Sequence, residues 1–147
     1  MSALLIGVIA GLRSMTAPAA VTWMAHAGRL DLANTWTAFM GWTSTRWIFT
    51  LLALGELVAD KLPSTPSRKA GPPFAARIVA GALSGAAIGG AGVVGLVAGG
   101  VGAIVGTLGG HAFRARLAAA IGRDLPAALI EDAVAVGGAF VLATLLA

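Results

Sequence analysis

The sequence predicts an all-α integral membrane protein, a glycine-rich bundle of about five transmembrane helices forming one domain over residues 1–147. Composition is the first observation: 58% of the 147 residues are hydrophobic, 11% are charged, and the mean hydropathy is +0.89. The second is that the charges divide the chain into apolar stretches of membrane-spanning length. The third is that many of the 21 glycines recur at helical spacing. A water-soluble globule is excluded, because so little polar surface could not cover it.

Charge and cysteine content exclude several functions. The net charge is +4 and the pI is about 11.2, but the ten cations are scattered and form no basic stripe, so no nucleic-acid partner is expected. The chain has no cysteine, which excludes disulfides, thiolate catalysis and cysteine-based metal sites. We expect no cofactor, leave a metal ion open, and regard an enzyme as the less favoured class.

The first predicted segment covers residues 3–26 and contains a charge in its middle. Arg13 is flanked on both sides by about ten uncharged residues, which predicts a position near the membrane midplane. Ser14 and Thr16 carry hydroxyls that can cap a helix, and Pro18 suits a first helical turn. We therefore expect the first helix to be broken here. No cation precedes the apolar run, so it is interpreted as a retained span and not a cleaved signal peptide.

Four more spans are expected. The second covers residues 41–60 and is followed by a proline-containing linker, interpreted as an extended cytoplasmic loop, over residues 61–73. Residues 78–113 carry no charge and would form one helix of about 54 Å, too long for a bilayer. The glycines within residues 89–92 predict a tight turn that separates spans at 74–90 and 93–112. The last span covers 126–146 and begins at Pro126.

The cations predict the orientation in an inner (plasma) membrane. Five spans place seven cations on one side: Lys61, Arg68, Lys69, Arg77, Arg114, Arg116 and Arg123. Only Arg29 and Arg46 fall on the other side. The positive-inside rule then predicts a cytoplasmic N-terminus and an external C-terminus. The four tryptophans surround the first loop, as expected at an outer interface: Trp23, Trp36, Trp42 and Trp47.

An internal duplication is one interpretation of two weak recurrences. Ile9-Ala-Gly11 recurs as Ile104-Val-Gly106, and the residues around Arg29 recur loosely around Arg123. Halves at residues 1–61 and 93–147, joined by a span at 74–92, would form an inverted repeat. Chance likeness between glycine- and alanine-rich helices is the other interpretation.

Arg13 is the strongest candidate for a functional residue. A central arginine costs at least about 2.5–3.5 kcal/mol to insert, so it needs a partner or a water-filled cavity. Beside a helix start at Ser14 and Thr16, it would attract an anion. The structural alternative is a buried ion pair with one of three carboxylates: Glu56, Glu131 or Asp132.

Four carboxylates are expected at the cytoplasmic mouth. Glu56 and Asp60 share a helical face, and Glu131 and Asp132 lie at the matching level of the last span. With Arg77 and Arg114 they would form a mixed-charge ring. This ring could relay protons, hold a divalent cation that meets a phosphate, or simply close the bundle with salt bridges.

Two further features have a functional and a structural interpretation. His111 lies before the basic end of the fourth span and could relay protons, contact an anion or anchor the helix at the interface. Glycines spaced four apart predict close helix packing, and a movable gate is the functional alternative. They are Gly81, Gly85, Gly89, Gly95, Gly99, Gly102, Gly106 and Gly110.

These motifs resemble those of a bacterial integral-membrane family known only as a domain of unknown function. The resemblance is carried by Gly11-Leu-Arg13-Ser14, by Glu56-x-x-x-Asp60-Lys61-x-Pro63 and by Glu131-Asp132. It covers nearly the whole chain and implies a polytopic membrane protein, without a reaction or substrate. The chain is also faintly similar to small fluoride channels, but it lacks their phenylalanine and threonine pore signature.

The sequence thus favours a small channel or secondary transporter that passes a small anion with proton involvement. Arg13, Ser14 and Thr16 would bind the anion, and Glu56 and Glu131 would handle protons. The alternatives are a lipid-phosphate-binding protein, either enzyme or flippase, and a structural subunit of a membrane complex. Expected partners are membrane lipid, a small ion or anionic substrate, and further copies of the chain.

Overall fold

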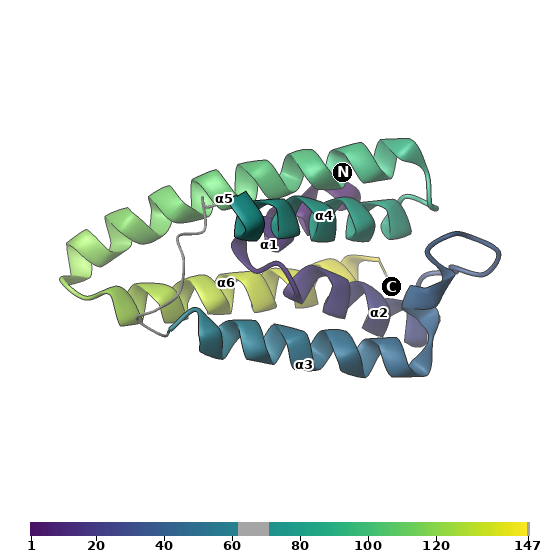
Figure 1. Ribbon diagram of the computed structural model, residues 1–147, viewed down its shortest axis with the longest axis horizontal. Coiled ribbons are helices and arrows are strands. Elements are labelled where there is room, and N and C mark those ends of the chain that lie inside the picture. The colour runs from purple at the N-terminus through teal and green to yellow at the C-terminus, as the bar shows by residue number, and fades with distance from the viewer. Residues whose placement is uncertain (62–70, 147) are drawn as a thin grey trace.

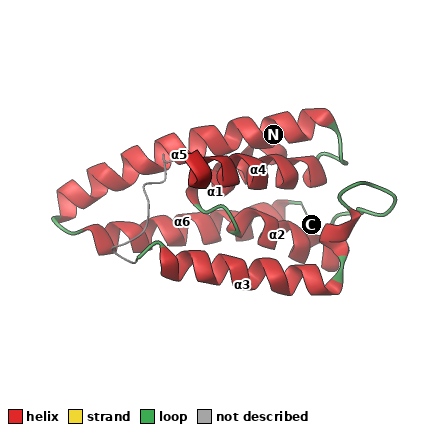
Figure 2. Cartoon of the chain, in the orientation of Figure 1, coloured by secondary structure: helices red, strands yellow, loops and turns green. Residues whose placement is uncertain are grey.

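The computed structural model describes residues 1–61 and 71–146, and within these ranges every regular element is a helix. The helices run lengthwise beside one another (Figures 1 and 2). In chain order they are α1 (Ser2–Leu12), α2 (Thr16–His26), the short 3-10 helix η1 (Ala38–Gly41), α3 (Thr43–Ala59), α4 (Gly71–Ile88), α5 (Val93–Ile121) and α6 (Asp124–Leu145). The expected linker falls largely outside the described residues. Helices α5 and α6 are each long and apolar enough to cross a membrane.

The first segment is interrupted at the predicted place. Helix α1 ends at Leu12, Arg13 has an extended backbone (φ −142°, ψ 107°), and α2 begins at Thr16 with Pro18 in its first turn. Thr107 Oγ1 donates a hydrogen bond of 3.2 Å to the carbonyl oxygen of Gly11, one of the carbonyls that the end of α1 leaves without a helical partner.

The chain reverses direction at this interruption, which corrects the prediction of one broken span. Gly7 lies against Gly99, and Gly11 lies against Thr107, so α1 runs parallel to α5. Contacts described below pair Arg13 with Asp132 and Arg29 with Ala143, so α2 runs parallel to α6. Because α5 and α6 are successive antiparallel helices, α1 and α2 form an antiparallel hairpin. The start of α1 and the end of α6 therefore lie toward the same end of the bundle (Figure 1), whereas a straight first segment would place them at opposite ends.

Helix length and charge explain this error. At 1.5 Å per residue the 11-residue α1 is about 16 Å long, half the thickness of a bilayer core. No lysine or arginine precedes Arg13, so charge counting could not locate the N-terminus. The same direction of α1 and α5 also argues against an inverted repeat, because the matching helices of such a repeat run in opposite directions.

The second predicted break is confirmed, whereas one helix end is not. Helix α4 ends at Ile88 and α5 begins at Val93, with positive φ at Gly90 (67°) and Ala91 (61°) in the turn. Trp36 Nε1 donates to the Ala91 carbonyl oxygen at 2.9 Å and ties the first loop to this turn. Helix α5 continues beyond residue 112 to Ile121, since the added segment is rich in alanine, and ends at Gly122 with φ 76°.

Glycines bring α1, α4 and α5 into backbone contact. A Cβ atom on Gly7 would lie 2.1 Å from the Gly99 carbonyl oxygen, and one on Gly99 would lie 2.1 Å from the Gly81 carbonyl oxygen. Backbone contacts below 3.0 Å occur at all the glycines singled out from the sequence except Gly110, whose Cβ would meet the side chain of Leu12. Gly7 and Gly11, which the sequence analysis did not include, complete the set on α1, and their spacing of four was the signal for them.

Replacing Gly99 by alanine is expected to lower the stability of the bundle by about 1–3 kcal/mol or more, because overpacking against backbone forces helices apart. Thermal unfolding in detergent, followed by circular dichroism, measures the change. Gly109→Ala on the same helix is the matched control, because nothing lies within 4 Å of its Cβ position. Equal melting temperatures for the two variants would contradict the proposed packing.

Candidate functional site

Arg13 lies at the tip of the α1–α2 hairpin and is fully buried. Its Nε donates to Asp132 Oδ1 at 2.7 Å, and its Nη1 and Nη2 form ion pairs with Asp60 and Asp132. Asp60 directly follows α3, and Asp132 lies in the first half of α6. A single guanidinium therefore connects the hairpin tip to two other helices, as an arginine can because it offers several donors in a fixed plane.

The structure places Arg13 relative to the other helices, whereas its depth in a membrane stays a prediction. Gly11 packs against Thr107, half-way along α5, but Arg13 itself pairs with the residue that ends α3. With respect to α3 the guanidinium therefore lies near one end and not in the middle. The ion pair with Asp132 was among the structural alternatives, whereas the pair with Asp60 was not.

Glu56 on α3 caps the start of α2. Its Oε1 accepts hydrogen bonds from Ser14 N (2.9 Å) and Ser14 Oγ (2.7 Å), and its Oε2 accepts one from Met15 N (2.8 Å). Both amides precede Thr16, the first residue of α2, and a carboxylate is favourable here because it satisfies these N–H groups beside the partial positive charge of the helix start. The place where an external anion was expected thus holds a carboxylate of the chain itself. Ser14 acts as a donor to Glu56 and not as the expected helix cap.

Two further cations complete this side of the site. Lys61 Nζ donates to Asp132 Oδ2 at 2.7 Å. Arg77 on α4 is 3% exposed, and its Nη2 lies 3.6 Å from Glu56 Oε1 and 3.9 Å from Asp60 Oδ2. Because Arg77 is a charged residue well inside an apolar helix, the sequence alone could identify it as a candidate site residue. Lys61 could be identified as one only through its neighbour Asp60.

A second pair lies beside the first group. Arg114 Nη1 on α5 lies 3.7 Å from Glu131 Oε2 on α6, and Arg114 also pairs with the exposed Asp124. Glu131 is 1% exposed. We refer to the eight charged residues together as the hairpin-tip cluster: Arg13, Glu56, Asp60, Lys61, Arg77, Arg114, Glu131 and Asp132.

The hairpin-tip cluster has no net formal charge, because four cations meet four carboxylates. Such pairing offsets the cost of taking charges out of water, and removal of one partner would leave an uncompensated charge.

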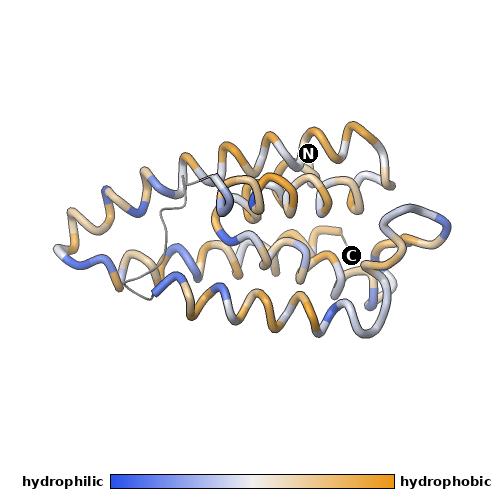
Figure 3. Tube along the Cα trace, viewed as in Figure 1, coloured by the Kyte–Doolittle hydropathy of each residue, from blue (hydrophilic) through white to orange (hydrophobic). Residues whose placement is uncertain are grey.

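In Figure 3 the hydrophilic residues gather toward the end of the bundle where α3 ends and α5 meets α6. Seven of the nine residues proposed as ligand or ion contacts, all but Thr16 and His111, belong to this region.

Thr16 and His111 lie outside the hairpin-tip cluster. Thr16 is buried in the first turn of α2 and faces an apolar groove. His111 is exposed on the surface of α5 and takes no part in the contacts of the cluster. Among the described residues no group of three or more His, Asp or Glu side chains is arranged to hold a metal ion.

A comparison with protein families, with curated proteins and with solved structures finds no match for this chain. The resemblance to a membrane family of unknown function therefore stays a prediction, and the site is interpreted from its own chemistry.

Replacing Arg13 by methionine is expected to lower stability by about 3–5 kcal/mol, because Asp60 and Asp132 would keep buried charge without their main partner. Arg116→Met, on the exposed surface of α5, should change stability by less than about 0.5 kcal/mol. Thermal unfolding in detergent compares the two.

The double variant Arg13→Met with Asp132→Asn should recover part of the loss, because it removes the excess negative charge that Arg13→Met leaves in the hairpin-tip cluster. An Arg13→Met protein as stable as the Arg116→Met protein would contradict the interpretation that Arg13 holds the bundle together.

Proposed function

We propose that this protein is a multi-pass inner-membrane channel or secondary transporter that moves a small anion together with protons. The hairpin-tip cluster is its site. The observation that carries this proposal is the carboxylate of Glu56, which accepts three hydrogen bonds at the tip of the hairpin. The donors are the amides of Ser14 and Met15 and the hydroxyl of Ser14. Membrane insertion itself rests on the composition and on the apolar lengths of α5 and α6.

In this proposal four helices cross the membrane and the α1–α2 hairpin is re-entrant. Helices α3 and α4, with 17 and 18 residues, are about 25–27 Å long and suit a slightly thin or locally adapted bilayer. Non-helical backbone at membrane depth is tolerated where protein buries it, which is the situation of Arg13. Four crossings and a re-entrant hairpin replace the five spans expected from sequence.

The cations still give the orientation. Five of the described cations lie toward the cluster end: Lys61, Arg77, Arg114, Arg116 and Arg123. Arg29 and Arg46 lie toward the tryptophan-rich end. By the positive-inside rule the cluster end is cytoplasmic, and both termini are external. The hairpin returns the chain to its starting side, so it changes the predicted location of the N-terminus and leaves the predicted sides of the later loops unchanged.

The proposed coupling follows from competition for one site. When ionised, Glu56 satisfies the amides of Ser14 and Met15 and excludes another anion from them. When protonated, it carries no charge and becomes a weaker acceptor, so a substrate anion can take its place beside Arg77. One anion would then move for each proton on Glu56. Glu131, which lies 3.7 Å from Arg114, is the second carboxylate that would carry a proton, because an arginine does not exchange one near neutral pH.

A structural subunit of a membrane complex is the second candidate. It is favoured by the complete burial of Arg13 and by its two carboxylate partners, which is what a helix-joining ion pair requires. The lipid-phosphate alternative gains less support, because a cluster without net charge does not attract a phosphate headgroup over long range.

Cysteine labelling tests the re-entrant hairpin, since the chain has no cysteine of its own. Ser2→Cys and Ala33→Cys should both react with a membrane-impermeant maleimide added to intact spheroplasts. Arg123→Cys should react only after the membrane is permeabilised. If Ser2→Cys behaves like Arg123→Cys, the N-terminus is cytoplasmic and α1 crosses the membrane.

Replacing Glu56 by glutamine is expected to abolish the coupling of anion and proton movement. Glutamine keeps the size and one acceptor oxygen but has no proton to exchange. In proteoliposomes containing fluoride, chloride, nitrate or acetate, anion uptake driven by an imposed pH gradient should fall about tenfold or more, the factor produced by about 1.4 kcal/mol of lost differential binding.

Asp31→Asn in the exposed first loop is the control for Glu56→Gln and should retain gradient-driven uptake. The wild-type protein should show this uptake for at least one of the four anions. If folded wild-type protein moves none of them, transport is contradicted and the structural candidate is favoured.

A further inference from the structure

An apolar groove opens between α2, α3 and α6 on the external side of the hairpin-tip cluster. Its volume is about 540 Å³, and its walls include Ala20 and Trp23 of α2, Ala53 of α3, and Ala139 and Phe140 of α6. Helix α2 has only 11 residues, and its side chains in the first half of the groove are small, so it only partly fills the space between the longer α3 and α6. The side chains along α6 from Val136 to Ala143 give it a length of about 10 Å.

Two arginines lie at the tryptophan-rich end, Arg29 in the wall of the groove and Arg46 beside the groove against Trp23, and neither has a carboxylate partner among the described residues. Arg29 lines the groove, is exposed, and donates from Nη1 to the Ala143 carbonyl oxygen at 2.6 Å. The guanidinium carbon of Arg46 lies 5.1 Å from the ring centre of Trp23 and 5.5 Å from that of Trp47. The Nε atom of Arg46 is buried and has no hydrogen-bond partner in the described part of the chain.

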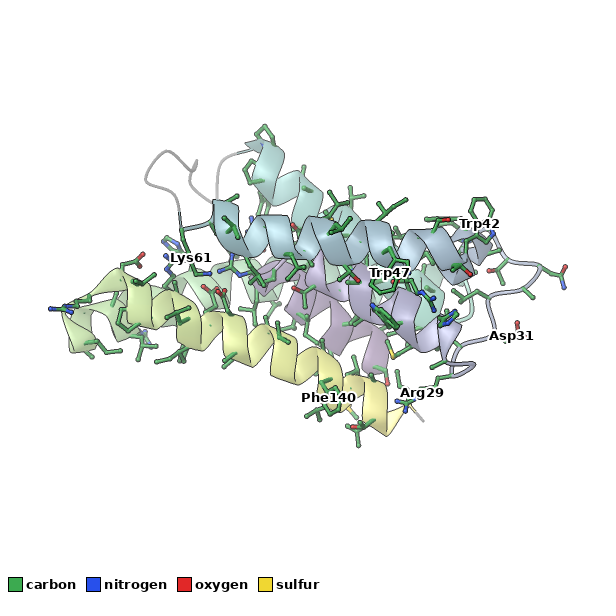
Figure 4. The ribbon with its side chains drawn as sticks, turned by 90° about the horizontal axis from the view of Figure 1, so that it is seen from below. Arg29, Asp31, Trp42, Trp47, Lys61 and Phe140 are labelled. Atoms are coloured by element: carbon green, nitrogen blue, oxygen red, sulfur yellow. The ribbon has the colours of Figure 1, made fainter. Side chains whose placement is uncertain are left out.

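We propose that this groove binds one phospholipid of the outer leaflet, with an acyl chain between α2, α3 and α6 and the phosphate at Arg29 and Arg46. The walls match a hydrocarbon chain, and the two unpaired cations match a phosphate. Tryptophans mark headgroup depth, and in Figure 4 Arg29, Trp42 and Trp47 lie away from Lys61, which marks the cluster end. The proposal rests on the membrane placement above and is independent of transport.

The test uses full-length protein in mild detergent, with palmitoyl-oleoyl phosphatidylglycerol added and bound lipid counted by native mass spectrometry. The wild-type protein should retain about one phosphatidylglycerol molecule per chain and should retain diacylglycerol, which has the same chains without a phosphate, much less. Equal retention of the two would show that Arg29 and Arg46 do not select a phosphate, and would overturn the proposal.

Two variants separate the groove from the headgroup contacts. Ala53→Trp fills the groove and should reduce retention of phosphatidylglycerol at least severalfold. Leu51→Trp, on the exposed face of the same helix at a residue 67% exposed, should bind like the wild-type protein. The double variant Arg29→Gln with Arg46→Gln leaves the groove walls unchanged and should also lose retention, so it tests the proposal if Ala53→Trp does not fold.

Unchanged retention in folded Ala53→Trp or in the double glutamine variant would overturn the proposal, and so would a second copy of the chain bound at this face in place of lipid. Because no ion flux is measured, failure of lipid binding leaves the transport proposal intact, and failure of transport leaves lipid binding intact.

Discussion

The structure depends on neutralising one buried guanidinium. Arg13 is fully enclosed, and an arginine in that position is tolerated only if carboxylates meet it directly. Asp60 brings the end of α3 to the hairpin tip, and Asp132 brings α6. Glu56, Lys61 and Arg77 are then drawn into the same network, because the two aspartates and the start of α2 need further partners. The buried charge thus determines which helices can be neighbours.

Glycine packing positions that charge. Helices α1, α4 and α5 meet backbone to backbone, so the short α1 can run deep between them without bulky side chains. Contact of this kind is favoured by van der Waals packing, which does not depend on water and works inside a bilayer. Since Gly11 lies against α5 and Arg13 follows two residues later, the glycine contacts fix the depth of the hairpin tip. Packing and electrostatics are therefore two parts of one arrangement.

Much of this could be predicted from sequence, because local signals were strong. The extended break after Arg13, the turn at residues 89–92 and the gathering of the charged residues all follow from residue type and spacing. The reversal at Arg13 could not be predicted, since the same break suits a straight or a folded-back segment and no cation precedes it. The end of α5 does not follow from the charge pattern, because arginine and alanine both favour helix. A charged residue such as Arg114 therefore does not mark the limit of a helix. Asp60 was missed as the partner of Arg13 because pairing depends on how α3 docks.

The distance along the chain between the hairpin and its partners sets the order of assembly. Arg13 and Asp132 are 119 residues apart, and Thr107 is 96 residues from Gly11. During synthesis the hairpin leaves the ribosome long before α5 and α6 exist, so its final contacts cannot form until α6 has been made. The hairpin is made before the helices that enclose it and is thus among the last parts of the bundle to settle, and until then its arginine lacks Asp132.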